Sequence, residues 1–131
     1  MKTALAVLLA AGLLLVARPA IAHHAFSAEF DANKPVTLTG TVTKVEWTNP
    51  HAWFYIDVAD VTGKVTNWAF ELGGPNTLIR EGWTRNSMKV GETVTVEGSR
   101  AKDGSPIANA QVVTLKSTGQ RLFAASSRGQ Q

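Results

Sequence analysis

The stretch that decides the fold reads Val36-Thr-Leu-Thr-Gly-Thr-Val42 and continues as Thr43-Lys-Val-Glu-Trp47. Its first half alternates apolar or small residues with threonine at a period of two, which is typical of a strand with one buried face. The phase slips by one residue at Thr43-Lys44, because Val45 and Trp47 become the apolar positions. A slip of this kind within a continuous strand predicts a β-bulge, at which the strand bends.

Four further strands are predicted downstream, at residues 52–58, 65–72, 93–100 and 108–115. Between the second and third of these, Pro75 suits the first turn of a short helix, which Gly82 would end. Three strands, a short helix and two more strands predict an all-β fold, a small five-stranded OB-like Greek-key barrel with one short helix between strands three and four. An immunoglobulin-like sandwich would need about seven strands.

Length and composition limit the number of domains and the kinds of site that the chain can contain. The chain has 131 residues, of which 44% are hydrophobic and 18% charged, which suits one folded domain and is too short for two. It has no cysteine, which excludes disulfides, thiolate zinc sites and cysteine nucleophiles. A bound metal would therefore need histidine, carboxylate or backbone nitrogen ligands.

Residues 1–22 have the features of a signal peptide. Lys2 gives a positive start, residues 4–16 are apolar without interruption, and Ala20-Ile-Ala22 places small residues where signal peptidase cleaves. The apolar stretch is too short to span a bilayer, which needs about 20 helical residues. We therefore expect cleavage after Ala22, a periplasmic or secreted mature protein that begins at His23, and no membrane insertion of the mature form.

The mature chain divides into three predicted parts. Residues 23–35 form an N-terminal arm, residues 36–116 the OB-like β-barrel domain, and residues 117–131 a partly disordered C-terminal tail. Cleavage leaves 11 basic residues against 10 acidic ones, a net charge of +1, with no basic run. This charge pattern does not favour nucleic acid as a partner.

The three histidines of the chain carry the main functional hypothesis. As the terminal residue, His23 would offer its α-amine and imidazole to one metal ion, and His24 would add its imidazole and amide nitrogen. Square-planar nitrogen ligation favours copper, with nickel or zinc as weaker choices. His51 lies in the predicted loop between strands one and two, and the arm, about 40 Å long when extended, could reach it. The sequence thus predicts an exported binding protein with a metal site at His23, His24 and His51, possible periplasmic partner proteins and no catalytic residue.

Other interpretations of these polar residues remain open. His51 could instead cap its loop with a hydrogen bond to backbone, and the two terminal histidines could have no role. Glu29 and Asp31 could supply oxygen ligands, although a solvated surface position is the simpler interpretation. Glu71 is expected to be isolated at the end of the third strand.

Aromatic side chains provide a second feature. Four of them fall on or near the first three strands, where an OB barrel binds ligands, and could form a face for a ligand or partner: Trp47, Trp53, Tyr55 and Trp68. They could equally cover the arm at Phe26 and Phe30. The alternative function is accordingly a metal-free module that binds a protein or an oligosaccharide. A third is a copper-dependent oxidase with a terminal-histidine brace, so enzymatic activity is left open.

Several motifs together resemble a family of small bacterial exported proteins of unknown function. They are His23-His-Ala-Phe-Ser-Ala-Glu-Phe-Asp31, Trp47-Thr-Asn-Pro-His51, Trp68-Ala-Phe-Glu71, Leu78-Ile-Arg-Glu-Gly-Trp83 and Gly91-Glu-Thr-Val-Thr-Val-Glu-Gly98. The resemblance extends from His23 to about Phe123. It implies export and a small β-barrel, and it brings no established activity.

Overall fold

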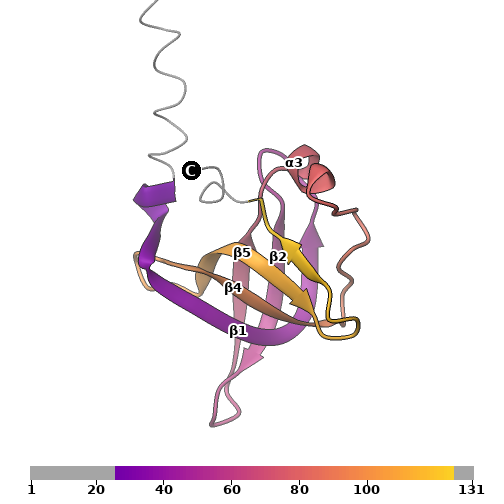
Figure 1. The fold of residues 1–131 in the computed structure, drawn as a ribbon. Coiled ribbons are helices and arrows are strands. Elements are labelled where there is room, and N and C mark those ends of the chain that lie inside the picture. Colours follow the sequence, from indigo (N-terminus) through magenta and orange to yellow (C-terminus); the bar gives the residue numbers. More distant parts are fainter. Residues whose placement is uncertain (1–25, 126–131) are drawn as a thin grey trace, which may run out of the picture.

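Strand β1 (Phe30–Glu46) joins the two halves of the sheet, as the computed structural model of the chain shows for the described residues, 26–125 (Figure 1). Residues 35–41 of β1 pair with β4 (Thr93–Ala101), and residues 41–46 pair with β2 (Trp53–Ala59). The register shifts between Val42 and Lys44, which confirms the bulge predicted from the phase slip. The strand begins at Phe30 rather than at Val36, so part of the predicted arm belongs to the sheet.

The remaining strands close the sheet on itself. β3 (Val65–Glu71) pairs antiparallel with β2 and parallel with β5 (Ile107–Leu115), which in turn pairs antiparallel with β4. The pairings therefore run in a ring through β1, β2, β3, β5 and β4. This is an all-β, mostly antiparallel, OB-like arrangement, and the helix α3 (Pro75–Arg80) lies between β3 and β4 as predicted.

The prediction of five strands is wrong, because the described residues form six. β6 (Arg121–Phe123) pairs with β5 and lies within the segment that we expected to be a tail. Its Leu122 is buried, and the indole Nε1 of Trp83 donates a hydrogen bond of 2.8 Å to the carbonyl oxygen of Phe123. The short strand is thus held by contacts with residues distant in the sequence.

The barrel interior is filled by apolar side chains from every strand of the ring and from α3. Pro75 occupies the first turn of α3, and Gly82 ends the segment with a φ of +94°, as the sequence indicated. The largest fully buried apolar side chains of this core are Phe54, Phe70, Ile56, Leu72, Leu78, Val42, Val94, Val96 and Val113.

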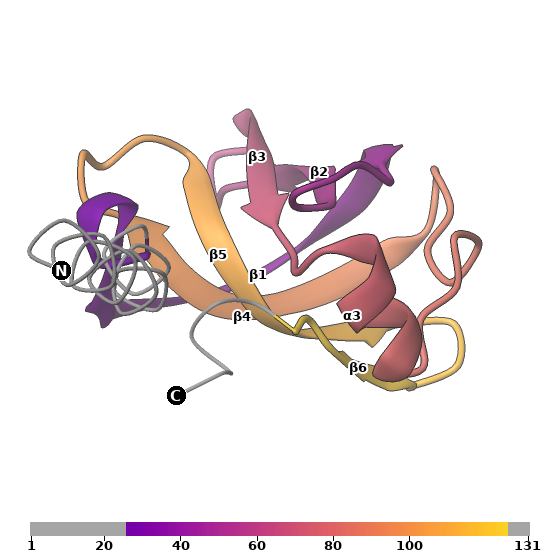
Figure 2. The same cartoon turned by 90° about the horizontal axis from the view of Figure 1, so that it is seen from above.

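The N-terminal segment packs separately from this core. A helical turn at residues 26–29 precedes β1 and lies at the opposite side of the barrel from α3 (Figure 2). No helix within residues 26–125 is long and apolar enough to cross a membrane.

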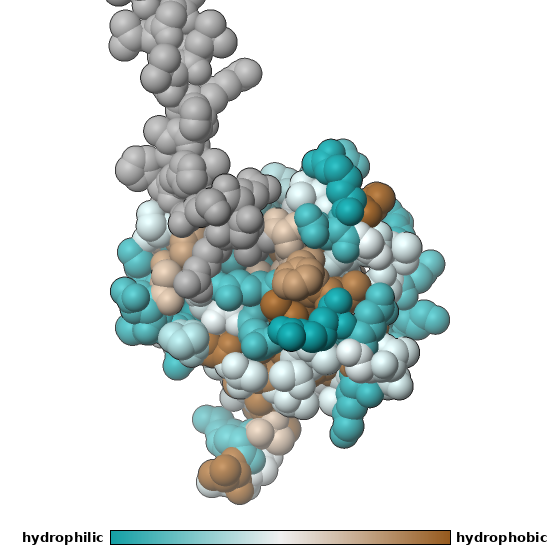
Figure 3. Space-filling model, in the orientation of Figure 1, coloured by the Kyte–Doolittle hydropathy of each residue, from teal (hydrophilic) through white to brown (hydrophobic). Residues whose placement is uncertain are grey.

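The β2–β3 hairpin projects from the barrel, and its tip forms a hydrophobic spot at the lower edge of a largely hydrophilic face (Figure 3). Val61 is fully exposed at this tip. The side chain of Asp60 accepts hydrogen bonds from the backbone nitrogens of Thr62 and Lys64, at 2.8 and 3.0 Å, which fixes the turn.

Candidate functional site

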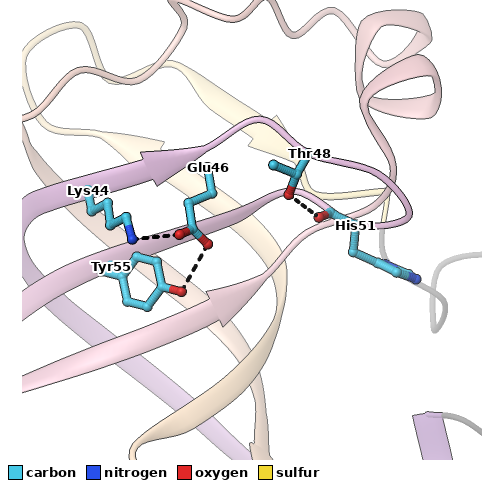
Figure 4. Close-up of polar contacts among 5 residues, drawn as sticks. All are labelled: Lys44, Glu46, Thr48, His51 and Tyr55. Carbon is cyan, nitrogen blue, oxygen red and sulfur yellow. Dashed lines mark hydrogen bonds and ion pairs between the residues drawn. The ribbon is translucent and has the colours of Figure 1, made fainter.

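His51 is held through one imidazole nitrogen, Nδ1, while its Nε2 has no hydrogen bond or ion pair with residues 26–125. Its Nδ1 lies 3.0 Å from the carbonyl oxygen of Leu72 and 3.2 Å from Oε1 of Glu71. Since a carbonyl oxygen can only accept, Nδ1 carries a proton in this contact, and Nε2 is the nitrogen through which the neutral ring could bind a metal. The side chain is 37% exposed, and its ring points away from Lys44, Glu46 and Tyr55 (Figure 4).

The backbone on both sides of His51 explains this placement. The amide of Ala52 donates to the oxygen of Gly73 at 3.0 Å, and the amide of Leu72 donates to the oxygen of Ala52 at 2.9 Å. The hydroxyl of Thr48 donates to the oxygen of His51 at 3.1 Å, which closes the loop. The β2–β3 ladder therefore extends past the strand ends and brings His51 opposite the end of β3.

Glu71 is a partner of His51 and not the isolated residue that we expected. It is only 8% exposed and lies on the outward-facing side of β3, in register with Trp53 of β2. Burial raises the pKa of the Glu71 carboxyl, and the nearby Glu29 raises it further, whereas a protonated His51 lowers it. The two carboxylates make the surroundings of His51 favourable for a cation.

Glu71 begins a short row of buried polar residues. It is in register with Asn109 of β5, which is in register with Ser99 of β4. Both atoms of the Asn109 side-chain amide are buried without a hydrogen-bond partner among the described residues. The side-chain Nε2 of Gln111 donates a hydrogen bond of 3.2 Å to the hydroxyl of Ser99. The polar surroundings of His51 thus continue across three strands.

The predicted metal ligands are only partly within the described residues. His23 and His24 lie outside them, and residues 26–125 contain no group of three His, Cys, Asp or Glu side chains that could hold a metal ion. Asp31 is occupied locally, because its carboxylate accepts a hydrogen bond from the amide of Asn33 at 2.9 Å. Among the predicted ligand residues and Glu71, His51 and Glu71 are in contact, and Glu29 raises the pKa of Glu71.

The four aromatic residues of the predicted face divide into two pairs. Trp47 and Trp68 pack against the hydrophobic core, whereas Trp53 and Tyr55 lie on the outer face of β2. The Tyr55 hydroxyl donates to Glu46 at 3.1 Å, and Lys44 forms an ion pair with the same carboxylate at 2.6 Å (Figure 4). These two contacts lower the pKa of Glu46. Tyr55 is therefore part of a surface cluster with Lys44 and Glu46. Trp53 is the outward-facing aromatic residue that lies in register with Glu71.

Trp53 also lines an open groove of about 490 Å³. The N-terminal segment forms one side of the groove and the turn between β4 and β5 the other. The groove residues besides Trp53 are Ala28, Glu29, Phe30, Ala101, Lys102, Asp103, Ser105 and Ile107. Because Glu29 belongs to this lining and also acts on Glu71, the groove adjoins the His51–Glu71 pair.

Comparisons with known proteins place the chain in a family without an assigned activity. Residues 10–110 match the family described as Family of unknown function (DUF6152), and the chain belongs to it. No curated protein matches the chain. Among solved structures, it is similar to the dimeric N-terminal domain of the PriB protein from Thermoanaerobacter tencongensis, with 21% sequence identity and a TM-score of 0.43. That similarity covers 63% of this chain and 96% of the other.

Proposed function

We propose that this small β-barrel is an exported protein that binds a transition metal, with copper as the preferred ion. The observation that carries the proposal is the pair of contacts at Nδ1 of His51. Its Nδ1 contacts Leu72 and Glu71, which leaves Nε2 as the nitrogen that would bind the metal. Metal-binding histidines have this arrangement, in which a backbone carbonyl or carboxylate orients the ring through the nitrogen that does not bind the metal.

The other ligands in this proposal come from the mature N-terminus. His23 would supply its amine and imidazole, and His24 its imidazole and amide nitrogen. A set dominated by nitrogen favours Cu(II) over harder ions. Glu71 and Glu29 would contribute negative charge close to the ion without being needed as ligands.

A titration of three mature proteins tests the proposal. The first begins at His23, confirmed by mass spectrometry, the second begins at His23 with its N-terminal amine acetylated, and the third carries His51→Ala. We expect the first to bind one Cu(II) tightly, and the other two to bind it at least about tenfold more weakly, as expected when one ligand is lost. Equal affinity in all three would refute a shared site.

Export is a separate part of the proposal, supported by the apolar stretch and small residues before His23. Expression of the full chain in a Gram-negative host, followed by fractionation and mass spectrometry, tests it. We expect a periplasmic product that begins at His23. A cytoplasmic product that retains residues 1–22 would contradict export and remove the terminal amine from the site.

The Trp53 groove favours a second candidate function, the binding of a neutral oligosaccharide. An indole can stack against the apolar face of a sugar ring, and Glu29, Asp103 and Ser105 could bind its hydroxyl groups. Cello-, chito- and malto-oligosaccharides would be titrated against the Trp53 indole NMR signal. Shifts of this signal in the wild type and in His51→Ala, together with calorimetric binding that is lost in Trp53→Ala, would support this candidate.

A further inference from the structure

The first half of β3 forms an open edge of the sheet, defined as residues 65–67. β5 pairs with β3 only at residues 69–71, and no other strand within residues 26–125 lies along the rest of β3 on that side. β5 diverges at Pro106, whose carbonyl oxygen accepts a hydrogen bond of 3.0 Å from the amide of Ala69. The open edge therefore belongs to the β2–β3 hairpin, which projects from the barrel away from α3 (Figure 1).

The backbone of the open edge can form hydrogen bonds with another strand. The amide of Ala69 points to Pro106, so the alternation along β3 directs the N–H and C=O groups of Val65 and Asn67 to the same side, away from β2. The side chain of Asn67 donates to Asp57 at 2.8 Å, which holds the edge in place. Val65 is 57% exposed. An ordered edge of this kind is a template to which an extended peptide can add as a further strand.

A fixed arginine without a carboxylate partner lies beside the open edge. The Cζ of Arg100 is 5.3 Å from the centre of the Trp68 ring, and its Nη2 donates a hydrogen bond of 2.6 Å to the carbonyl oxygen of Gly104. In the described part of the chain Arg100 forms no ion pair, and its buried Nε has no hydrogen-bond partner. A guanidinium held in this way loses little side-chain freedom when it binds a carboxylate.

The alternation of the sheet relates this arginine to one face of the open edge. Thr66 and Trp68 lie on the same face of β3, so the residue of an added strand opposite Thr66 would project toward Arg100. Its two neighbours would project to the other face, on which Val65 is exposed. We propose that the open edge is a docking site for an extended acidic segment of a partner protein, with a carboxylate opposite Thr66 and an apolar residue on either side of it.

Charge argues against a second copy of this chain as the occupant. Antiparallel pairing of two open edges about Thr66 would place Lys64 of one copy opposite Trp68 of the other, on the face where Arg100 lies. Pairing about Val65 would place the same lysine opposite Thr66. Either register brings two positive charges together and supplies no carboxylate, whereas an acidic strand supplies one.

Two synthetic peptides test the proposal in NMR titrations of the isotope-labelled mature protein. The first is acetyl-Ser-Thr-Val-Glu-Val-Thr-Ser-amide, and the second has glutamine in place of glutamate. We expect both peptides to shift the backbone amide signals of Val65 and Asn67. The acidic peptide should bind about tenfold more tightly than the neutral one, because it forms a charge-assisted hydrogen bond with Arg100.

Variants separate the backbone contribution from the charge contribution. Val65→Pro removes the amide donor of the edge and keeps the hydrogen bonds to β2, because this N–H points away from β2. It should lose binding of both peptides, and Val65→Thr, which keeps the donor, should retain it. Arg100→Gln should abolish the preference for the acidic peptide, whereas Arg80→Gln, at the exposed end of α3, should retain the preference. Thermal unfolding shows whether each variant is folded.

The wild type alone can refute the proposal. Unchanged amide signals at Val65 and Asn67, or equal affinity for the two peptides, would overturn it, as would full binding by Val65→Pro. Analytical ultracentrifugation tests the other occupant, because a dimer that becomes a monomer in Val65→Pro would assign the open edge to a second copy. The titrations contain no copper, so their outcome does not depend on the proposed metal site.

Discussion

Replacing Glu71 by glutamine should weaken copper binding and stabilise the metal-free protein at the same time. Glutamine keeps the shape and an acceptor oxygen next to the Nδ1 of His51 but removes the negative charge. Loss of a group that orients a metal-binding histidine typically reduces metal affinity by 10–100-fold. In the variant the Leu72 carbonyl, at 3.0 Å, still holds Nδ1 of His51, so we expect a loss of affinity at the lower end of this range. That is about tenfold, or ~1.4 kcal/mol.

Whereas Glu71→Gln should weaken copper binding, it should make the metal-free protein more stable. Burial raises the pKa of Glu71 in the folded protein, so the folded state binds more protons than the unfolded state between the two pKa values. The free energy of unfolding of the wild type therefore falls as pH rises between these two pKa values. Above them, at neutral pH, the buried Glu71 carboxylate still destabilises the folded state. Glu71→Gln should remove this slope and raise the Tm at pH 7.

Thermal unfolding in a chelator from pH 4 to 8, together with Cu(II) competition titrations, measures both effects. Glu81→Gln is the matched control, because Glu81 is exposed at the end of α3 and should change neither quantity. An unchanged affinity in Glu71→Gln would show that the carboxylate does not act on a metal site. A lower Tm at neutral pH would refute the argument from burial.

Two further predictions concern the contacts that hold the C-terminal segment. Gly73→Ala should destabilise the protein by about 1–3 kcal/mol in chemical denaturation, because the added Cβ would overlap the carbonyl oxygen of Ala125; a neutral effect would show that this segment shifts freely. Trp83→Phe removes the indole donor to Phe123 and should cost about 1–2 kcal/mol. It should also speed hydrogen exchange at the Leu122 amide, and unchanged exchange there would contradict a role of this hydrogen bond in holding β6.

The barrel was predictable where local patterns are strong. The alternation in residues 36–42 and the slip at Thr43-Lys44 predicted a bent first strand, and the structure has both the strand and the bulge. Pro75 and Gly82 predicted the helix between β3 and β4. β6 was missed because three residues with one buried side chain show no period, and its hydrogen bond to Trp83 spans 40 residues of sequence.

Of the candidate site, only the residue in the β1–β2 loop was predictable from the sequence. The Asn-Pro-His motif identified His51, but its contact with Glu71 depends on the register between β2 and β3, which no local pattern reveals. The sequence did contain a sign that the four aromatic residues lie on two different sides of the sheet. Trp68 shares the alternation of Phe70 and Leu72, both of which are buried, so its inward side of β3 could have been read from the sequence.

The buried polar row supports a functional interpretation of this side of the barrel. Glu71, Asn109 and Ser99 are the buried polar or charged residues among those described, and the closing β3–β5 pairing makes them neighbours. A buried amide without a hydrogen bond costs about 1–3 kcal/mol, which apolar residues at the same positions would avoid. Departures from the most stable arrangement are expected at functional sites. The row ends at the carboxylate that contacts His51, so it extends the polar surroundings of the proposed metal site across three strands.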